Sequence, residues 1–245
     1  MRGVVLAGGR GERMRAQTAG SNKHLLPVGG RAMIDYPIGA LIDAGITDIL
    51  VVTGAEHAEA MRQHLRTTPL AELAELSLAE QAGPAGIADA LALAEAFAAG
   101  GPICVILGDN IFETSMAPTA ARFRADPTGS LLLLTESDEP ERFACVRFEQ
   151  DDPAGAITEI IEKPDGAPAS MIVTGIYFYD GSVFDICRAQ APSARGELEI
   201  TDVNNAFVRR GQLRHERLDG WWVDAGTPES LERAERLLAT REPPA

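Results

Sequence analysis

The chain has 245 residues, of which 45% are hydrophobic and 24% are charged, a composition typical of a globular protein with a sizeable core. A formal net charge of −14 argues against nucleic acid or an anionic membrane as a partner, and no apolar run is long enough to cross a bilayer. The three cysteines have no CxxC spacing, so we expect neither a disulfide framework nor a zinc site, and we expect a cytoplasmic protein.

The first half of the chain alternates short apolar runs with segments of helical periodicity. We predict strands at 3–7, 48–53, 76–80 and 103–107, and helices at 31–44, 56–66 and 87–99. Strands that are separated by helices pair in parallel through right-handed crossovers. This order predicts an α/β protein with a Rossmann-like, three-layer α/β/α fold and a mostly parallel sheet.

The pattern changes after residue 128. We predict consecutive strands at 130–136, 144–149, 157–163 and 172–179, followed by helices at 180–190, 198–210 and 227–240. Consecutive strands without helices between them indicate antiparallel pairing, so the second half adds antiparallel strands to a mixed sheet. No linker, repeat or low-complexity tract divides the chain, and we therefore predict a single domain over 1–245.

A glycine-rich segment, Leu6–Met14 (LAGGRGERM), follows the first predicted strand. Glycines let backbone N–H groups approach phosphate oxygens, and Arg13 can neutralise their charge. A dinucleotide fingerprint is excluded because Met14 occupies its last glycine position, and the P-loop string is absent. Residues 1–31 hold six basic residues against one acid, which suits a small anionic ligand. Taken alone, the segment is equally compatible with a structural turn.

Ligands of open α/β sheets bind beyond the carboxyl ends of the strands. The segments 7–23 and 108–113 each follow a predicted strand directly. We therefore expect both segments on the same rim of the sheet.

Read together with Asn22–Pro27 (NKHLLP), the glycine-rich segment resembles the two-part signature of the sugar-1-phosphate nucleotidylyltransferases, G-G-x-G-[ST]-R-L followed by K-x-[ML]-[LV]-P. The branch that it resembles most is that of the glucose-1-phosphate thymidylyltransferases, especially their short form. Further motifs match in order along the chain: VILGDNIF (105–112), PERF (140–143), IEKP (161–164), VTGIYFYD (173–180), ARGELEITDVNN (194–205) and GWWVDAGT (220–227).

The resemblance implies a nucleotidyltransferase fold, with a nucleotide-binding half at 1–128 and a sugar-phosphate-binding half at 129–245. It also implies an enzyme of nucleotide-sugar biosynthesis that uses Mg²⁺ to join dTTP, or UTP, to glucose 1-phosphate or a related sugar phosphate, making dTDP-glucose and pyrophosphate from the preferred pair. We expect no nucleic acid and no membrane partner, and a homo-oligomer is compatible with the sequence.

The resemblance also assigns residues. The nucleotide-binding positions are Leu6, Gly8, Gly9, Gly11, Arg13, Lys23, Gln81 and Gly86. The sugar-phosphate-binding positions are Asn110, Ala144, Glu162, Lys163, Val173, Thr174, Arg195 and Trp222. The metal ligands are Asp109 and Asp224, and the catalytic residues are Arg13, Lys23, Lys163 and Asp109.

Physical chemistry agrees with several of these roles. Lys23 and Lys163 are the only lysines among 22 basic residues, so a compact ammonium is indicated at both places. Two carboxylates that follow separate strands suit one Mg²⁺, although either Asp alone is also typical of a helix cap or turn. The amide of Gln81 can donate and accept at once, which suits the N3–H and O4 edge of thymine or uracil. Of the adjacent Trp221 and Trp222, we expect one to line the pocket and the other to pack.

Four positions depart from the thymidylyltransferase pattern: Glu12, Asp89, Ala144 and the stretch 69–74. They leave open uridylyl or other nucleotidylyl transfer to a modified sugar or cyclitol phosphate. A non-catalytic regulator that binds nucleotide sugars is the remaining alternative. It is disfavoured because Lys23, Asp109 and Asp224 are all present.

Overall fold

The computed structural model describes residues 1–9, 14, 18, 21–166, 169–193 and 195–240. Within them, nine strands form one sheet: β1 (Arg2–Ala7), β4 (Asp48–Gly54), β5 (Glu75–Gln81), β6 (Ile103–Leu107), β8 (Ser130–Glu136), β9 (Ala144–Phe148), β10 (Ile157–Glu162), β11 (Met171–Tyr179) and β12 (Leu213–Arg217). Two short antiparallel pairs lie beside it, β2 (Pro27–Val28) with β3 (Arg31–Ala32) and β7 (Asn110–Phe112) with β13 (Trp222–Asp224).

The described α-helices are α2 (Asp35–Asp43), α3 (Ala58–Thr67), α4 (Ile87–Ala92), α5 (Glu95–Ala98), α6 (Ala117–Ala125), α7 (Val183–Ala189), α8 (Ile200–Arg209) and α9 (Pro228–Ala239). Short 3₁₀ helices occur at η2 (Lys23–Leu25), η3 (Ala55–His57), η4 (Pro69–Glu72), η5 (Pro140–Arg142) and η6 (Glu149–Asp151). None of the helices in the described ranges has both the length and the apolar character needed to span a membrane.

The sheet is mixed, as predicted. Strands β5, β4, β1 and β6 are parallel neighbours, and β11 joins β6 in antiparallel orientation. Strand β11 also pairs antiparallel with β8 and β9, and β10 pairs antiparallel with β9. Strand β12, which the sequence did not predict, extends the sheet parallel to β8. The predicted parallel strands of the first half and the antiparallel strands added by the second half are confirmed, and β12 is a parallel strand beyond them.

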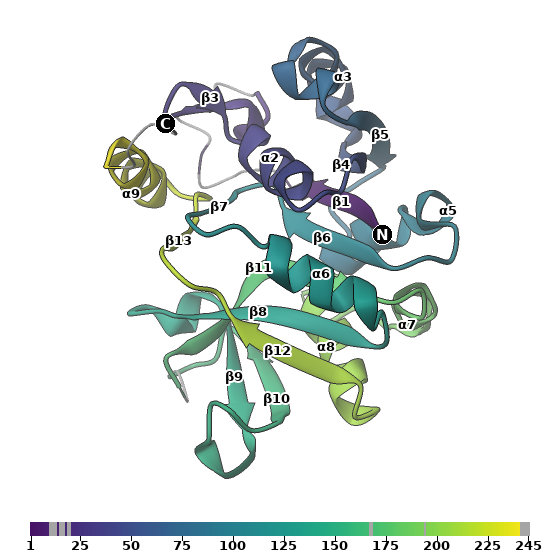
Figure 1. The fold of residues 1–245 in the computed structure, drawn as a ribbon, viewed down its shortest axis with the longest axis vertical. Helices are drawn as coiled ribbons and strands as arrows, with labels where there is room; N and C mark the ends of the chain where they lie inside the picture. The colour runs from purple at the N-terminus through teal and green to yellow at the C-terminus, as the bar shows by residue number, and fades with distance from the viewer. Residues whose placement is uncertain (10–13, 15–17, 19–20, 167–168, 194, 241–245) are drawn as a thin grey trace.

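Helices cover both faces of the sheet (Figure 1). The alternation of strand side chains explains how the two faces are filled. Val4 and Leu6 of β1 pack into one core with α4, α5, α7 and α8, whereas Val5 and Ala7 pack into a second core with α2, α3 and α6. Because both faces of the central strands are apolar, those strands read as unbroken hydrophobic runs, and the predicted three layers are confirmed.

Some predicted boundaries were wrong for local reasons. Residues 31–32 belong to the β2–β3 hairpin, so α2 begins at Asp35 instead of residue 31. The helix expected over 87–99 is divided into α4 and α5. Among the elements that were not predicted are β7, α6 and β12, because each is short or carries too few apolar residues to produce a clear period.

A third, smaller core lies between the C-terminal helix and segments from the first half of the chain. It joins the β2–β3 hairpin, the β7–β13 pair and helix α9, through Val28, Met33, Ile111, Val223 and Ala234. Figure 1 shows α9 beside the hairpin, at the end of the strand that carries Asp224. Helix α9 begins with a capping box between Thr227 and Ser230, which fixes its start at Pro228, with three residues between it and the end of β13.

Candidate active site

The two segments that were expected on one rim do lie together. Strand β1 is the switch point of the parallel part of the sheet, because β4 pairs on one side of it and β6 on the other. Leu6 is paired with Leu107 in register, and the amide of Gly108 donates to the carbonyl of Leu6 at 2.9 Å. The segments after β1 and β6 thus begin side by side, at the position where doubly wound sheets bind ligands.

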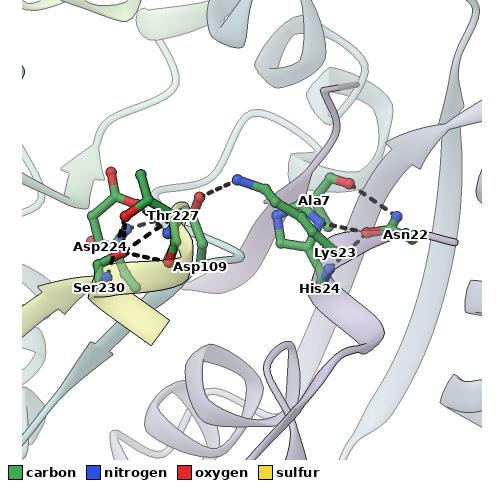
Figure 2. Close-up of polar contacts among 10 residues, drawn as sticks. Ala7, Asn22, Lys23, His24, Asp109, Asp224, Thr227 and Ser230 are labelled. Atoms are coloured by element: carbon green, nitrogen blue, oxygen red, sulfur yellow. Dashed lines mark hydrogen bonds and ion pairs between the residues drawn. The ribbon is translucent and has the colours of Figure 1, made fainter. Parts of the chain in front are cut away.

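Lys23 reaches Asp109 from the first of these segments. Its Nζ lies 2.5 Å from Asp109 Oδ2, and both side chains are only 13% exposed (Figure 2). The backbone around Lys23 is held by Asn22, whose Oδ1 accepts from the backbone N–H of His24 at 2.9 Å and whose Nδ2 donates to Thr53 Oγ1 at 3.0 Å. The short 3₁₀ helix η2, which Asn22 caps at its N-terminus, therefore places the ammonium of Lys23 at the rim of the sheet.

The contact between Lys23 and Asp109 influences the protonation states of Asp109 and His24. Burial is the largest influence on Asp109 and raises its pKa, but the charge and hydrogen bond of Lys23, together with His24 and the hydrogen bond from Asn110, outweigh burial, so the net pKa lies below the usual range of a carboxyl. Burial first, and then the charge of Lys23, lower the pKa of His24 to about 3. His24 is consequently neutral at pH 7, and its Nδ1 lies 2.7 Å from Asn22 Oδ1. The ring of His24 also lines the first of the two cavities described below.

Asp224 arrives at the same place from the other end of the chain. It pairs with Asn110 in the β7–β13 ladder, and the amide of Ala225 donates to the carbonyl of Asp109 at 2.8 Å. A Cβ placed on Gly226 would lie 2.7 Å from Asp224 Oδ1, 3.3 Å from Asp109 Oδ2 and 3.4 Å from Lys23 Nζ. Two carboxylates and one ammonium therefore surround a single point.

This donor set fits Mg²⁺. The ion prefers oxygen ligands and is commonly held by one or two carboxylates together with substrate phosphates and water. Within the described ranges, no three His, Cys, Asp or Glu side chains form a potential metal cage. The described residues bring the two predicted metal ligands, Asp109 and Asp224, to one point beside Lys23.

Two cavities, of about 210 and 200 Å³, adjoin at Asp109. The first is lined by every predicted nucleotide-binding residue that the structure describes: Leu6, Gly8, Gly9, Lys23, Gln81 and Gly86. Gly11 and Arg13, which were also predicted, lie outside the described residues. The similar sizes and the three shared lining residues, Ile87, Leu107 and Asp109, indicate a bipartite site with a carboxylate at the junction.

Gly86 needs to be a glycine. Its φ of +106° is rarely adopted by other residues, and a Cβ there would lie 2.4 Å from the carbonyl oxygen of Leu198. The backbone beside it is tied to the same segment, since Leu198 donates to the carbonyl of Ala85 at 2.8 Å. The close approach brings residues 197–198 against the start of α4, so that Glu197 also lines the first cavity.

Gln81, whose amide was expected both to donate and to accept toward a base, uses its donors within the protein in this structure. Its Nε2 donates to the carbonyl of Gly86 at 3.1 Å and to Asp89 Oδ2 at 2.8 Å. An amide nitrogen has only two hydrogens, so its donors are already used within the protein.

The second cavity is lined by seven of the eight predicted sugar-phosphate-binding residues: Asn110, Ala144, Glu162, Lys163, Val173, Thr174 and Trp222. Arg195 lies at its edge, where its guanidinium is 2.9 Å from Glu199 and 3.5 Å from Glu162. Thr174 faces the cavity in part only, because its hydroxyl donates to the carbonyl of Leu133 at 2.7 Å.

Asn110 organises the floor of this cavity. Its Oδ1 accepts from the backbone N–H of Gly175 at 2.9 Å and from Trp222 Nε1 at 2.7 Å, while its Nδ2 donates to Asp109 Oδ1 at 3.2 Å. The ring of Trp222 also lies edge-on to Phe143, with centroids 5.3 Å apart. Trp221 packs instead against the third core, as the alternation along the strand predicted.

Glu162 and Lys163 form the far wall. Glu162 Oε2 accepts from Thr201 Oγ1 at 2.5 Å, and Lys163 Nζ lies 3.6 Å from Glu162 Oε1. Lys163 has a φ of +43°, in the left-handed region that non-glycine residues rarely occupy. The end of β10 is therefore held in a costly conformation that presents an ammonium to the cavity.

Sequence reasoning missed further lining residues of the second cavity. They are Phe143, Tyr177, Glu199, Thr201 and Asn204. All five lie in motifs that were recognised along the chain, but their own residue types carry no signal of function. Only the pairing of β11 with β6 and with β9, which Phe143 precedes, and the position of α8 bring them to the site.

Comparisons with known proteins agree with this geometry. The profile of the family described as "Nucleotidyl transferase" matches residues 2–241. The glucose-1-phosphate thymidylyltransferase of Xanthomonas campestris pv. campestris is 38% identical over 242 residues, which cover 98% of this chain and 81% of that protein.

Two solved structures are also similar. A Bacillus anthracis structure in complex with sucrose, provisionally assigned as a glucose-1-phosphate thymidylyltransferase, superposes with a TM-score of 0.91 at 41% identity and covers 100% of this chain and 98% of its own. A UDP-glucose pyrophosphorylase complexed with UDP-glucose superposes with a TM-score of 0.89 over 98% of this chain and 99% of its own, at 21% identity, and shows the fold alone.

Proposed function

Because the chain belongs to the nucleotidyl transferase family, we propose that it joins a nucleoside triphosphate to a sugar 1-phosphate, with dTTP and α-D-glucose 1-phosphate as its substrates. The observation that carries the proposal is the bipartite site, in which two cavities of similar size adjoin at Asp109, beside Lys23 and Asp224. The choice of substrates rests on the names of relatives that are 38–41% identical.

The reaction is an in-line displacement. A phosphate oxygen of the sugar 1-phosphate forms a bond to the α-phosphorus of the triphosphate, and the bond from that phosphorus to the β-phosphate bridging oxygen breaks, releasing pyrophosphate. The attacking oxygen is already anionic near neutral pH, so the site needs no general base. Catalysis then depends on alignment and on neutralising crowded negative charge.

The residues divide this work between the two cavities. Lys23, at the junction, neutralises charge on the nucleotide phosphates, and Asp109 and Asp224 hold Mg²⁺, which supplies Lewis-acid stabilisation of the phosphoryl oxygens when it is bound. On the sugar side, Lys163 and Arg195 receive the phosphate of the sugar, and Glu162 accepts hydrogen bonds from sugar hydroxyls.

Uridylyl transfer is the second candidate. The carbonyl oxygen of Gln81 is the group that this side chain leaves to a base, and uracil and thymine present the same N3–H to such an acceptor. The fold does not favour one base over the other, since a UDP-glucose pyrophosphorylase has it as well.

The test is pyrophosphate release from dTTP, UTP, CTP and GTP with glucose 1-phosphate and a panel of other sugar and cyclitol phosphates, with and without EDTA. We expect the highest kcat/KM for dTTP with glucose 1-phosphate. Asp109→Asn and Asp224→Asn should each lower kcat by about 100- to 1000-fold without unfolding the protein, because each removes a carboxylate from the ion.

Asp185→Asn is the matched control, since Asp185 lies in the first turn of α7 with an exposed side chain. Full turnover in EDTA, or in either site variant, would contradict the two-carboxylate metal site. Failure to release pyrophosphate with any pair of substrates would contradict the proposed reaction.

A further inference from the structure

The side chain of Gln81 is held by two acceptors. Gln81 ends β5 and is 4% exposed, and its Nε2 donates to the carbonyl of Gly86 at 3.1 Å and to Asp89 Oδ2 at 2.8 Å. Gly86 caps α4 and Asp89 lies in the first turn of that helix. The end of a strand and the start of the next helix are thus joined through one amide group.

This arrangement fixes the orientation of the amide. A backbone carbonyl, and an Asp carboxylate at neutral pH, accept hydrogen bonds and donate none. Turning the amide over would place Gln81 Oε1 against two acceptor oxygens and leave its NH₂ group without them. Hydrogen-bonding chemistry alone therefore decides which atom faces which partner.

The oxygen of the amide faces the first cavity. A Cβ placed on Gly8 would lie 2.8 Å from Gln81 Oε1, so this oxygen borders the glycine that follows β1. In the described part of the chain, Gln81 and Gly8 both line the cavity, whereas Asp89 stands behind Gln81 and does not. Asp89 acts on the cavity through Gln81.

We propose that Asp89 is a positioning residue for nucleobase selectivity: it holds Gln81 so that only a carbonyl oxygen meets the base. This inference rests on the proposed function for the identity of the ligand. Such a contact requires a base with a ring N–H, as in the imide of uracil and thymine. Cytosine has a lone pair on N3 at that place, so two acceptors would face each other.

The proposal predicts what a change at Asp89 does. An Asn at this position can donate to Gln81 Oε1 or accept from Gln81 Nε2, so the carbonyl of Gly86 alone then opposes the reversed orientation, and the amide of Gln81 adopts it more often than in the wild type. In the reversed orientation its NH₂ group faces the cavity and can donate to N3 of cytosine. A Glu at position 89 remains an acceptor only and keeps the original orientation.

The experiment measures binding of UMP and CMP to the full chain by calorimetry, without a sugar phosphate, so that no turnover is needed. These two nucleotides differ only at the base edge in question. Wild type should bind UMP about 10- to 100-fold more tightly than CMP, as expected for one unsatisfied contact. Asp89→Asn should reduce this ratio by about 10-fold, whereas Asp89→Glu should keep it within about 3-fold.

Asp185→Asn makes the same chemical change in the first turn of α7 and should leave the ratio unchanged. Thermal unfolding checks each variant, and Asp89→Ala replaces Asp89→Asn if the latter does not fold. The proposal would be overturned by an unchanged ratio in Asp89→Asn or Asp89→Ala, or by a loss in Asp89→Glu equal to that in Asp89→Asn. It would also be overturned if the wild type preferred CMP or bound neither nucleotide.

Binding and pyrophosphate release separate this inference from the proposed function. A ratio that shifts in a protein without turnover would support the role of Asp89 and contradict nucleotidylyl transfer. If the protein releases pyrophosphate but its ratio of UMP to CMP affinity does not respond to changes at position 89, nucleotidylyl transfer would be supported and the role of Asp89 would be contradicted.

Discussion

Lys163 combines a functional group with an unfavourable backbone. Its φ of +43° costs about 1 kcal/mol for a residue with a Cβ, and its ammonium faces the second cavity. Asn tolerates this region of the backbone better than Lys does. Stability and activity should therefore respond in opposite directions when Lys163 is replaced by Asn.

We expect Lys163→Asn to raise the free energy of unfolding by up to about 1 kcal/mol and to lower kcat/KM for the sugar phosphate by about 30- to 1000-fold. Urea denaturation measures the first effect, and steady-state kinetics with each substrate varied in turn measures the second. Ala99, which has a φ of +50° at the end of α5, provides the control. Ala99→Asn should stabilise without altering kinetics. An effect of Lys163→Asn on the affinity for dTTP alone would refute the assignment of Lys163 to the sugar side.

At the level of elements, α6 is tied to β12 by a charged cluster. Arg122 donates to both carboxylate oxygens of Glu216, at 2.8 and 2.6 Å, and Thr119 Oγ1 donates to Oε2 at 2.6 Å. The hydrogen bond from Arg122 is the main cause that lowers the pKa of Glu216 below its ordinary value of 4.5. Neither α6 nor β12 was predicted, and this contact joins them across 94 residues of sequence.

The lowered pKa sets the sign of a pH effect. A carboxyl whose pKa falls on folding stabilises the native state above its unfolded pKa, and that contribution is lost as the pH drops through the folded pKa. Glu216→Gln should therefore lower the free energy of unfolding by about 1 kcal/mol at pH 7 and by much less at pH 3.

Urea denaturation at the two pH values measures this difference. Glu159→Gln, which breaks the more exposed pair of Glu159 with Arg147, should change stability by less than about 0.5 kcal/mol. A loss of stability in Glu216→Gln that is equally large at both pH values would exclude the ionised carboxylate as its source.

For the whole molecule, the third core decides where Asp224 lies. Helix α9 packs its buried Ala234 against Val28 and Met33 near the N-terminus and against Val223 next to Asp224. A substitution that disturbs the packing of this core should therefore shift Asp224 at the junction of the two cavities, although no described residue of α9 lines either cavity.

Ala234→Asp places a carboxylate in this core and should lower the free energy of unfolding by about 2–5 kcal/mol. We expect turnover to fall further than the fraction of unfolded protein explains, because Asp224 loses its alignment with Asp109. Chemical denaturation and kcat at a temperature where the variant is folded test the two effects. Glu235→Ala, at the exposed neighbouring position, should leave both unchanged. A stably folded Ala234→Asp variant with full turnover would show that α9 does not align the site.

The sequence by itself determined those features that depend on near neighbours. The apolar run of Ile103–Leu107 predicted β6 at its observed bounds, because a strand buried on both faces needs side chains that are apolar throughout. The placement of Lys23 and Asp109 on one rim followed from the segments that hold them, 7–23 and 108–113, each of which begins directly after such a strand. The spacing of the motifs was enough to indicate the family, since each motif is local.

Only the tertiary structure decided which side chains face one another. Strand β12 has no apolar run and forms because it can pair with the edge of β8. Asp224 lies close to Asp109 because α9 packs against the β2–β3 hairpin. The donors of Gln81 are taken by Gly86 and Asp89, which no pattern in the sequence could reveal. The physical reason is the same in each case: periodicity and propensity act over a few residues, whereas a hydrogen bond or a core contact depends on distance in space.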